Sequence, residues 1–372
     1  MNLDFHYYGT YLAACIAGYS RQQAEQIAYA AELTDDNTKQ TFLSNADFEQ
    51  IPTSRETSEI VAEAASFLIA YGLEDERRAQ EIWGCFHFLP GNLDDRIRYQ
   101  GKTSKLGWNF YRDSEAKFKQ MCLPNGSLVE EMVNHLVSLD PDMEEIGLKM
   151  HVLADTWAHA YFAGIPEWAL NDVRQSEGLY EWDRGNWCGI QGEVSSANDP
   201  GTHTYQIVKG SSMRYVSPLY LGHGQLGSIP DFGYLRYKYL PVWKESLSGD
   251  SRFIEKNNQE SFKKAFRQMV AALAAIREHK NFQCGCEANA LDNKMETMID
   301  QVLSTRKTDQ SEEWISAIKD IAGHSPKPYV RKSWSEECKN AQNQTLTNYY
   351  RFQKAAKQHR NWVLSKVGLI GN

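Results

Sequence analysis

The sequence predicts a mainly α-helical protein, a multi-helix bundle with a loop-rich insert and additional C-terminal helices. Apolar residues recur with helical spacing in segments that together cover most of the 372 residues. Helix-start signals precede several of these segments, and glycine becomes dense, together with several Trp and Tyr residues, between residues 178 and 249. A hydrophobic fraction of 42% and a charged fraction of 24% are typical of a globular chain that buries a large core.

Two helices open the chain as a hairpin. Residues 7–17 form an apolar run that ends before Gly18. Ser20 and Gln23 then have the spacing of a capping box, which predicts the start of a second helix that ends near Leu33.

Four more helices follow in the first half of the chain. They are predicted over residues 57–72, 76–86, 127–139 and 141–162. Ser127 and Glu130 have capping-box spacing at the start of the third of them. Asp140 is the expected N-cap of the fourth, with Pro141 in its first turn.

The second half begins with the insert and returns to helices. Residues 178–249 hold 11 of the 25 glycines together with several Trp and Tyr residues, so we expect a loop-rich insert with short strands over residues 165–250. Helical patterns return over residues 259–281, 290–304, 310–322 and 333–366. Pro326 and Pro328 give a linker signal near residues 323–330. We therefore divide the chain into residues 1–250 and a C-terminal region, residues 251–372.

The charge is distributed unevenly. The net charge is −8 overall, −14 in residues 1–249 and +6 in the remainder. An acidic chain disfavours broad nucleic-acid binding, and the acidic part is where we expect cations to bind. The basic C-terminal region, which also carries aromatic residues, can contact an anionic membrane surface or an acidic partner. A solvated helix face is the more common explanation of such a run.

Several signals bear on the compartment. The N-terminus lacks the basic and apolar segments of a classical signal peptide, and no stretch reaches the 18 apolar residues of a membrane span. The seven cysteines form no regular framework, which favours reduced thiols. We expect a protein without a transmembrane segment that is cytoplasmic, or exported without a classical signal peptide.

The strongest motif is a run of three candidate metal ligands. His151, Asp155 and His159 are spaced i, i+4, i+8. At about 100° per residue they project from one face of a helix over two turns. Zinc prefers imidazole nitrogen and carboxylate oxygen, and a carboxylate between two imidazoles can bridge neighbouring ions. Polar residues on an exposed face, or a buried His–Asp hydrogen bond, are the alternatives, but two histidines around one aspartate favour metal binding.

Other candidate ligands occur along the chain. They are His6, which follows Asp4; Asp35 and Asp36 at the end of the second helix; His87 at the end of a later helix; His223 between two glycines; and Asp231. We expect other roles for His135, His203, His279, His324 and His359.

In their order along the chain these motifs resemble those of the zinc-dependent phospholipase C and P1 nuclease superfamily, and more narrowly an uncharacterised bacterial group related to it. The resemblance covers residues 1–235. It implies a helical fold that holds two or three zinc ions and hydrolyses phosphodiesters of lipids or single-stranded nucleic acids. In the better known members the N-terminal residue itself binds metal, whereas Met1 here lies five residues ahead of His6.

The resemblance also implies the ligand groups. Asp36 or Asp35 would join His87, His151 and Asp155 at one ion; His159, His223 and Asp231 would hold a second; and His6 with Asp155 would form a third position. A metal-activated water would be the nucleophile, with Asp155 bridging two ions. Asp4, or whichever of Asp35 and Asp36 is not a ligand, would be the general base.

The substrate is predicted only by class. A small phosphoester or a lipid headgroup suits the acidic part of the chain better than a long polyanion. Trp157, Tyr161, Trp182 and Trp187 can contact a substrate, although core packing is the more common role of large aromatic residues. Two alternatives remain: a zinc amidase or other metallohydrolase, and a non-catalytic, zinc-stabilised helical protein that acts as an interaction or effector protein.

Overall fold

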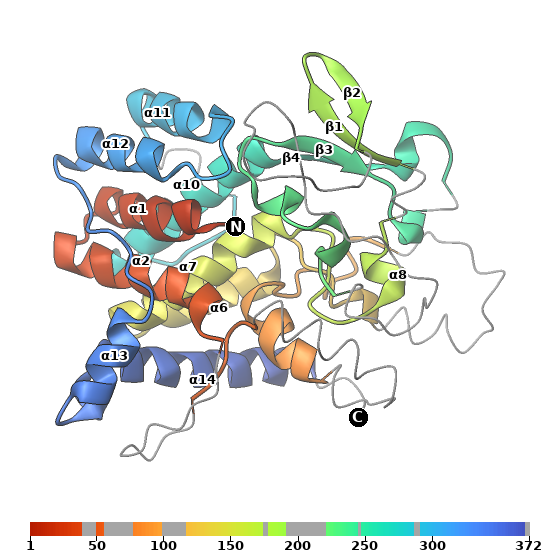
Figure 1. The fold of residues 1–372 in the computed structure, drawn as a ribbon. Helices are drawn as coiled ribbons and strands as arrows, with labels where there is room; N and C mark the ends of the chain where they lie inside the picture. The colour runs from red at the N-terminus through yellow and green to blue at the C-terminus, as the bar shows by residue number, and fades with distance from the viewer. Residues whose placement is uncertain are drawn as a thin grey trace.

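A computed structural model describes residues 1–38, 50–55, 77–98, 117–173, 178–190, 221–244, 247–285 and 291–368. These residues form a mainly α-helical protein with one small antiparallel sheet, which confirms the predicted fold class (Figure 1). The predicted helix over residues 57–72 and the residue His203 lie outside the described residues.

The first half of the chain contains most of the helices that precede the sheet. They are the π-helical turn η1 (Asp4–Gly9), α1 (Thr10–Ile16), α2 (Arg21–Asp36), the π-helical turn η2 (Gln80–Gly84), α6 (Ser127–Val137), α7 (Met143–Ala158) and α8 (Trp168–Asn171). The predicted capping box at the start of α2 is confirmed, because the Ser20 side chain accepts from the Gln23 backbone and the Gln23 side chain accepts from the Ser20 backbone.

Two predicted helix starts are wrong by one or two residues. The N-cap of α6 is Gly126, and it makes no side-chain cap bond. This glycine packs against Gly91, whose Cα would lie 2.8 Å from a Cβ added to Gly126, so the N-cap position leaves no room for a side chain. Similarly, α7 begins after Asp142, whose backbone is extended, so Asp140 is not its N-cap.

The predicted end of α7 also differs from the structure. The helix ends at Ala158, not near Phe162, and His159 is its C-cap. Tyr161 has a φ of 78°, a left-handed conformation that cannot continue the helix. The chain turns there, and the Tyr161 amide donates to the Cys122 carbonyl at 2.9 Å.

The structure has a four-stranded antiparallel sheet, of which three strands lie in the predicted insert and the fourth lies just after it, in the region predicted to be helical. Its strands are β1 (Leu179–Asp183), β2 (Asn186–Gly189), β3 (Arg236–Tyr239) and β4 (Ile254–Asn257), in the order β2-β1-β3-β4. One face buries Leu179, Tyr237 and Tyr239. On the other face the guanidinium of Arg236 lies 4.6 Å from the centre of the Trp182 ring. Short 3₁₀ turns, among them η4 (Gly224–Leu226) and η5 (Ile229–Asp231), precede β3 within the insert.

The C-terminal region is helical, as predicted. Its helices are α10 (Asn258–Glu278), α11 (Asn293–Ser304), α12 (Ser311–Ala322), α13 (Ser333–Asn340) and α14 (Asn348–Val367). The single helix predicted over residues 333–366 is wrong, because the chain breaks between α13 and α14. The side chain of Asn343 accepts from the Thr345 amide, and that of Thr347 caps α14 at Tyr350. These local bonds compete with continuation of the helix.

Helix α7 lies at the centre of the molecule, against α2, α10 and α14 (Figure 1). Gly147 permits the close approach of α7 to α2, since a Cβ there would lie 2.1 Å from the Ile27 carbonyl oxygen of α2. Buried side chains from both predicted regions, Leu153 and Phe266 among them, belong to one apolar core. Among the described residues, no helix combines the length and apolar character needed to cross a membrane.

Candidate metal centre

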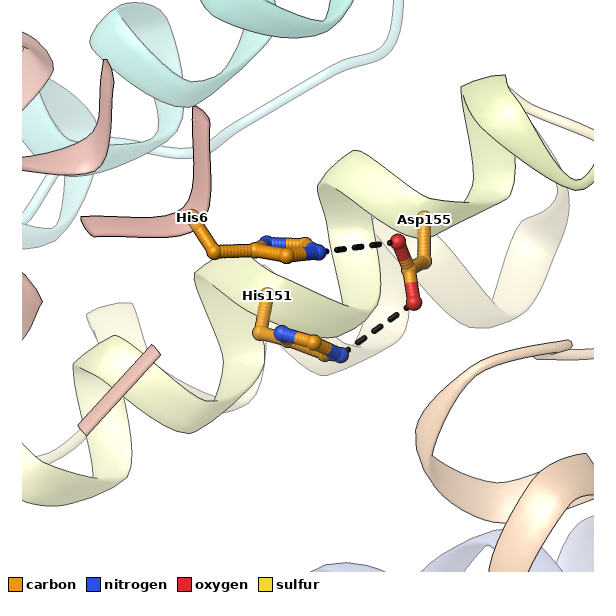
Figure 2. A group of neighbouring side chains, drawn as sticks. All are labelled: His6, His151 and Asp155. Atoms are coloured by element: carbon orange, nitrogen blue, oxygen red, sulfur yellow. Dashed lines mark ion pairs between the residues drawn. The ribbon is translucent and has the colours of Figure 1, made fainter. Parts of the chain in front are cut away.

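Helix α7 supplies the middle of the candidate site. His151 and Asp155 lie one turn apart and are fully buried, and the His151 Nε2 atom lies 3.2 Å from Asp155 Oδ2. The ring of His6, from η1, stacks on the His151 ring with 3.9 Å between their centres. Figure 2 shows both rings directed at Asp155, with His6 Nε2 lying 3.2 Å from Oδ1. One carboxylate therefore faces two imidazoles through its two different oxygens.

The end of α2 and the turn that follows η2 complete a second side of the site. His87 Nδ1 lies 3.2 Å from Asp155 Oδ2 and 3.5 Å from Asp35 Oδ1. It also lies 3.2 Å from His151 Nε2. Asp35, His87 and His151 each offer a ligand atom within 4.8 Å of the others, a group that could hold a metal ion. His6, His151 and Asp155 form another such group.

The structure distinguishes Asp35 from Asp36. Asp36 points away from the imidazoles: its Oδ2 accepts a hydrogen bond from the Tyr329 hydroxyl at 2.8 Å, and its Oδ1 lies 2.9 Å from Arg331 Nε. Asp36 is therefore neither the ligand nor the general base that the sequence left open. Adjacent residues on a helix point about 100° apart, so only one of the two faces the site.

Asp4 is also placed differently from its prediction as a general base. Its Oδ1 accepts from the Phe5 amide and its Oδ2 from the Gln310 amide, both at 2.8 Å. Burial raises the pKa of Asp4 to about 6, although the two amides act in the opposite direction. With both oxygens held by backbone groups, Asp4 anchors the start of α12.

A third group forms between the end of α7 and the insert. His159 Nε2 lies 3.1 Å from Asp231 Oδ1, and His223 Nε2 lies 3.8 Å from Asp231 Oδ2. His159, His223 and Asp231 again could hold a metal ion. His159 remains close to the α7 site although it is the C-cap, since its Nδ1 lies 3.5 Å from Asp155 Oδ2.

Three of the imidazoles are oriented by backbone carbonyls. His87 Nε2 lies 2.8 Å from the Thr53 oxygen, His159 Nδ1 lies 2.8 Å from the His87 oxygen, and His223 Nδ1 lies 2.9 Å from the Gly227 oxygen. A carbonyl only accepts, so each of these nitrogens carries the hydrogen. In the neutral ring the other nitrogen has a lone pair, and it faces Asp155 or Asp231. Metal-binding histidines show this arrangement.

The remaining two imidazoles have buried nitrogens without hydrogen bonds. Both nitrogens of His6 and Nδ1 of His151 are in this state among the described residues. His6 Nε2 is close to Asp155 but lacks hydrogen-bond geometry. Leaving a polar atom buried and unpaired costs about 1–3 kcal/mol, so such atoms at the centre of a carboxylate cluster are suited to a bound cation.

The α-amino group of Met1 lies between the groups, which the sequence analysis missed. Its nitrogen is 2.9 Å from Asp155 Oδ1 and 3.2 Å from Asp231 Oδ1. Burial lowers the pKa of this amine, but Asp155, Asp231 and Asp35 outweigh burial and raise it to about 11. The ammonium thus supplies positive charge where two carboxylates converge. No sequence motif predicts a role for a terminal amine. The resemblance to the phospholipase C superfamily, in which the N-terminal residue binds metal, was the one indication of it.

The electrostatics suit cation binding. Burial opposes ionisation of Asp155 and Asp231, yet the pKa of each is held well below its usual value: His159 and the Met1 amine are the main causes at Asp155, and the amine and His223 at Asp231. Burial lowers the pKa of His6 and of His223 to about 4, so both rings are neutral at pH 7. The site therefore offers charged carboxylates and imidazole lone pairs together.

Part of the site reaches solvent. The side chain of Asp35 is 33% exposed, and those of His223 and Asp231 are each 16% exposed, while Asp155 is at 1%. A separate cavity of about 380 Å³, lined by Lys149 and His359 among others, lies between α6, α7 and α14 and contains none of the candidate ligands. The solvent exposure of Asp35 and Asp231 is therefore separate from this cavity.

The other predicted residues lie outside the three groups. His279 and His359 bond to backbone carbonyls elsewhere, and His324 bonds to the Tyr11 hydroxyl. Trp157 donates to the Gln268 side chain and packs against the core. Arg236 lies over both Trp182 and Trp187, so each indole already has a cationic partner.

Comparison with known proteins identifies a family but no activity. A model of a family of unknown function, DUF6765, matches residues 1–367. No curated protein and no solved structure matches the chain. The resemblance to the zinc-dependent phospholipase C superfamily therefore stays a prediction.

Proposed function

Since the chain belongs to DUF6765, a family of unknown function, we propose its activity from the candidate metal centre alone: a zinc-dependent hydrolase of phosphodiesters or phospholipid headgroups. The observation that carries the proposal is the set of imidazoles at His87, His159 and His223. One nitrogen of each ring donates to a backbone carbonyl, and the other faces the carboxylate of Asp155 or Asp231. Such rings are prepared to bind metal through the second nitrogen.

The distances suggest how the ligands would divide. His151 belongs to two of the groups, but one nitrogen lone pair serves one ion. Asp155 separates those two groups: its Oδ2 faces His87 and His151, and its Oδ1 faces His6 and the Met1 amine. We assign one position to Asp35, His87, His151 and Asp155 Oδ2, a second to His159, His223 and Asp231, and a third to His6, Asp155 Oδ1 and the amine once it has lost its proton.

Zinc is the metal that this donor set fits best. Imidazole nitrogens with a minority of carboxylate oxygens are typical of zinc, whereas magnesium and calcium prefer oxygen ligands alone. Bound zinc would act as a Lewis acid and lower the pKa of a bound water to about 7. Asp155, shared between two positions, would hold them together.

The chain's own residues would orient the water and accept its proton. Asp35 is the most exposed carboxylate of the centre, at 33%. Its Oδ1, 3.5 Å from His87 Nδ1, would bind at the first metal position, and its Oδ2, 3.7 Å from His6 Nε2, would remain to act on the water. It replaces Asp4 and Asp36 as the candidate base, because the oxygens of those two residues have other partners. The same exposure favours catalysis over a purely structural site, since structural zinc sites are closed by protein ligands.

The test is elemental analysis combined with turnover. Purified protein should contain two or more zinc ions per chain and hydrolyse a chromogenic phosphodiester. A chelator should abolish this turnover, and added zinc should restore it. Cleavage of a chromogenic amide without cleavage of the phosphodiester would indicate an amidase instead. Stoichiometric zinc with turnover of neither substrate would overturn the proposal in favour of a structural metal.

A further inference from the structure

A buried hydrogen-bond network connects the C-terminal helix α14 to the metal centre. In Figure 1, α14 crosses the base of the bundle, beneath α2 and α7. Residues 50–55 lie between α14 and His87 and form no helix or strand of their own. The position of this segment therefore depends on the bonds that other elements make to it.

Gln353 of α14 is the first link. Its Oε1 accepts from the Ile51 amide at 2.8 Å, and its Nε2 donates to Asn37 Oδ1 at 2.9 Å. The side chain is only 1% exposed, so water does not replace either bond. The hydroxyl of Tyr349, one turn earlier, also donates to Asn37 Oδ1, at 3.3 Å.

Asn37, the C-cap of α2, is the second link. Its Nδ2 donates to the Ile51 oxygen at 2.6 Å and to Thr53 Oγ1 at 3.3 Å. Its backbone oxygen accepts from the Thr53 amide at 3.0 Å. Thr53 Oγ1 in turn donates to the Thr34 oxygen of α2 at 2.7 Å. Backbone and side chain together hold Thr53 against the end of α2.

The last link reaches the imidazole. The carbonyl oxygen of Thr53 accepts from His87 Nε2 at 2.8 Å, and this bond leaves Nδ1 directed at Asp35 and Asp155. Any shift of Thr53 would rotate or translate the ring. Replacing a partner that orients a metal-binding histidine typically lowers metal affinity about 10- to 100-fold.

We propose that Gln353 is a positioning residue of the metal centre, which acts through Asn37 and the Thr53 carbonyl to fix the orientation of His87. The C-terminal helix is then part of the site, although it supplies no ligand. This inference rests on the proposed function, because it takes His87 to be a metal ligand. An amide is required at residue 353, since it must accept from Ile51 and donate to Asn37 at once.

The experiment compares Gln353→Leu with Gln358→Leu in the full chain. Gln358 is exposed on the same helix, so its replacement makes the same chemical change without breaking the network. Zinc affinity is measured by competition with a chromogenic chelator, and ligand geometry by the visible spectrum of the cobalt-substituted protein. Gln353→Leu should bind one ion about 10- to 100-fold more weakly and shift the cobalt bands. Gln358→Leu should match the wild type in both.

A double-mutant cycle with His87→Ala separates positioning from general damage. If Gln353 acts through His87, adding Gln353→Leu to His87→Ala should not weaken the remaining zinc positions further. Thr53→Val removes the hydroxyl bonds and keeps the carbonyl, so it should lower zinc affinity less than Gln353→Leu does. It is the substitute test if Gln353→Leu does not fold.

The outcomes distinguish this inference from the function on which it rests. Wild-type protein that binds no zinc would overturn both. Wild-type protein that binds zinc, with a folded Gln353→Leu variant of unchanged affinity and cobalt spectrum, would overturn the positioning role alone. The positioning role would also be overturned if Gln353→Leu lowered zinc affinity as much in the His87→Ala background as in the wild type. Failure of both the Gln353 and Thr53 variants to fold would overturn it too, because either result means that the network stabilises the fold in general.

Discussion

Replacing Asp155 with Asn tests the bridging role of this carboxylate. Its oxygens lie 2.9 Å from the Met1 amine and 3.2 Å from ring nitrogens of His6, His87 and His151. An amide keeps the size of the side chain but removes the charge and one acceptor oxygen. Since Asp155 is proposed to serve two metal positions and His6 only one, Asp155→Asn should lose more zinc than His6→Ala.

The same change should destabilise the metal-free protein. With an effective dielectric constant of about 20, charges 2.9 Å apart attract by about 6 kcal/mol. The amine keeps its second carboxylate, Asp231, at 3.2 Å, which offsets part of the loss. We expect the free energy of unfolding to fall by about 3–5 kcal/mol, the range for breaking a buried ion pair.

Two assays measure these effects. Zinc per chain is determined by elemental analysis after dialysis, and stability by urea unfolding in the presence of a chelator. Replacement of His135 or His279, which lie outside the three groups, provides the control and should leave the zinc content unchanged. Equal zinc content in the Asp155→Asn and His6→Ala variants would refute the bridging role, and loss of zinc in the controls would mean that the wrong histidines were assigned.

Three further predictions follow from single contacts. Asp35→Asn should lose zinc in elemental analysis and Asp36→Asn should retain it, because only Asp35 faces the imidazoles. Loss of zinc in Asp36→Asn and its retention in Asp35→Asn would mean that Asp36 is the ligand. Burial lowers the pKa of His359 from 6.5 to about 3, so the fold disfavours its charged form and stability falls as the pH drops from 6.5 towards 3. Acidification from about pH 7 to pH 5 should therefore destabilise the wild type by about 2 kcal/mol more than His359→Gln in urea unfolding, and equal slopes would contradict this. Gly147→Ala should lower the free energy of unfolding by about 1–3 kcal/mol, since the new Cβ would meet the Ile27 oxygen; a thermal scan that shows no change would mean that α2 can move away.

Local spacing made much of the metal centre predictable. His151, Asp155 and His159 come together because residues four apart on a helix share a face, and this holds even though the helix ends at Ala158. His87, His223 and Asp231 were found by residue type and by their order along the chain. The structure brings all of them to the same helix, as the sequence analysis expected.

The rest depends on contacts distant in sequence. Asp35 and Asp36 are equivalent until Tyr329 and Arg331 bind Asp36 from nearly 300 residues away. The Met1 amine reaches Asp155 through the packing of η1 on α7, and no local pattern encodes that approach. The break between α13 and α14 has a local cause instead: the capping bonds of Asn343 and Thr347 outweigh helical periodicity.

The central claim is that these imidazoles and carboxylates bind zinc, and anomalous X-ray diffraction at the zinc edge tests it most directly. Crystals grown with zinc should show one anomalous peak among Asp35, His87 and His151, and another among His159, His223 and Asp231. Zinc-soaked crystals without a peak at either position, and with the rings arranged as they are here, would contradict the account.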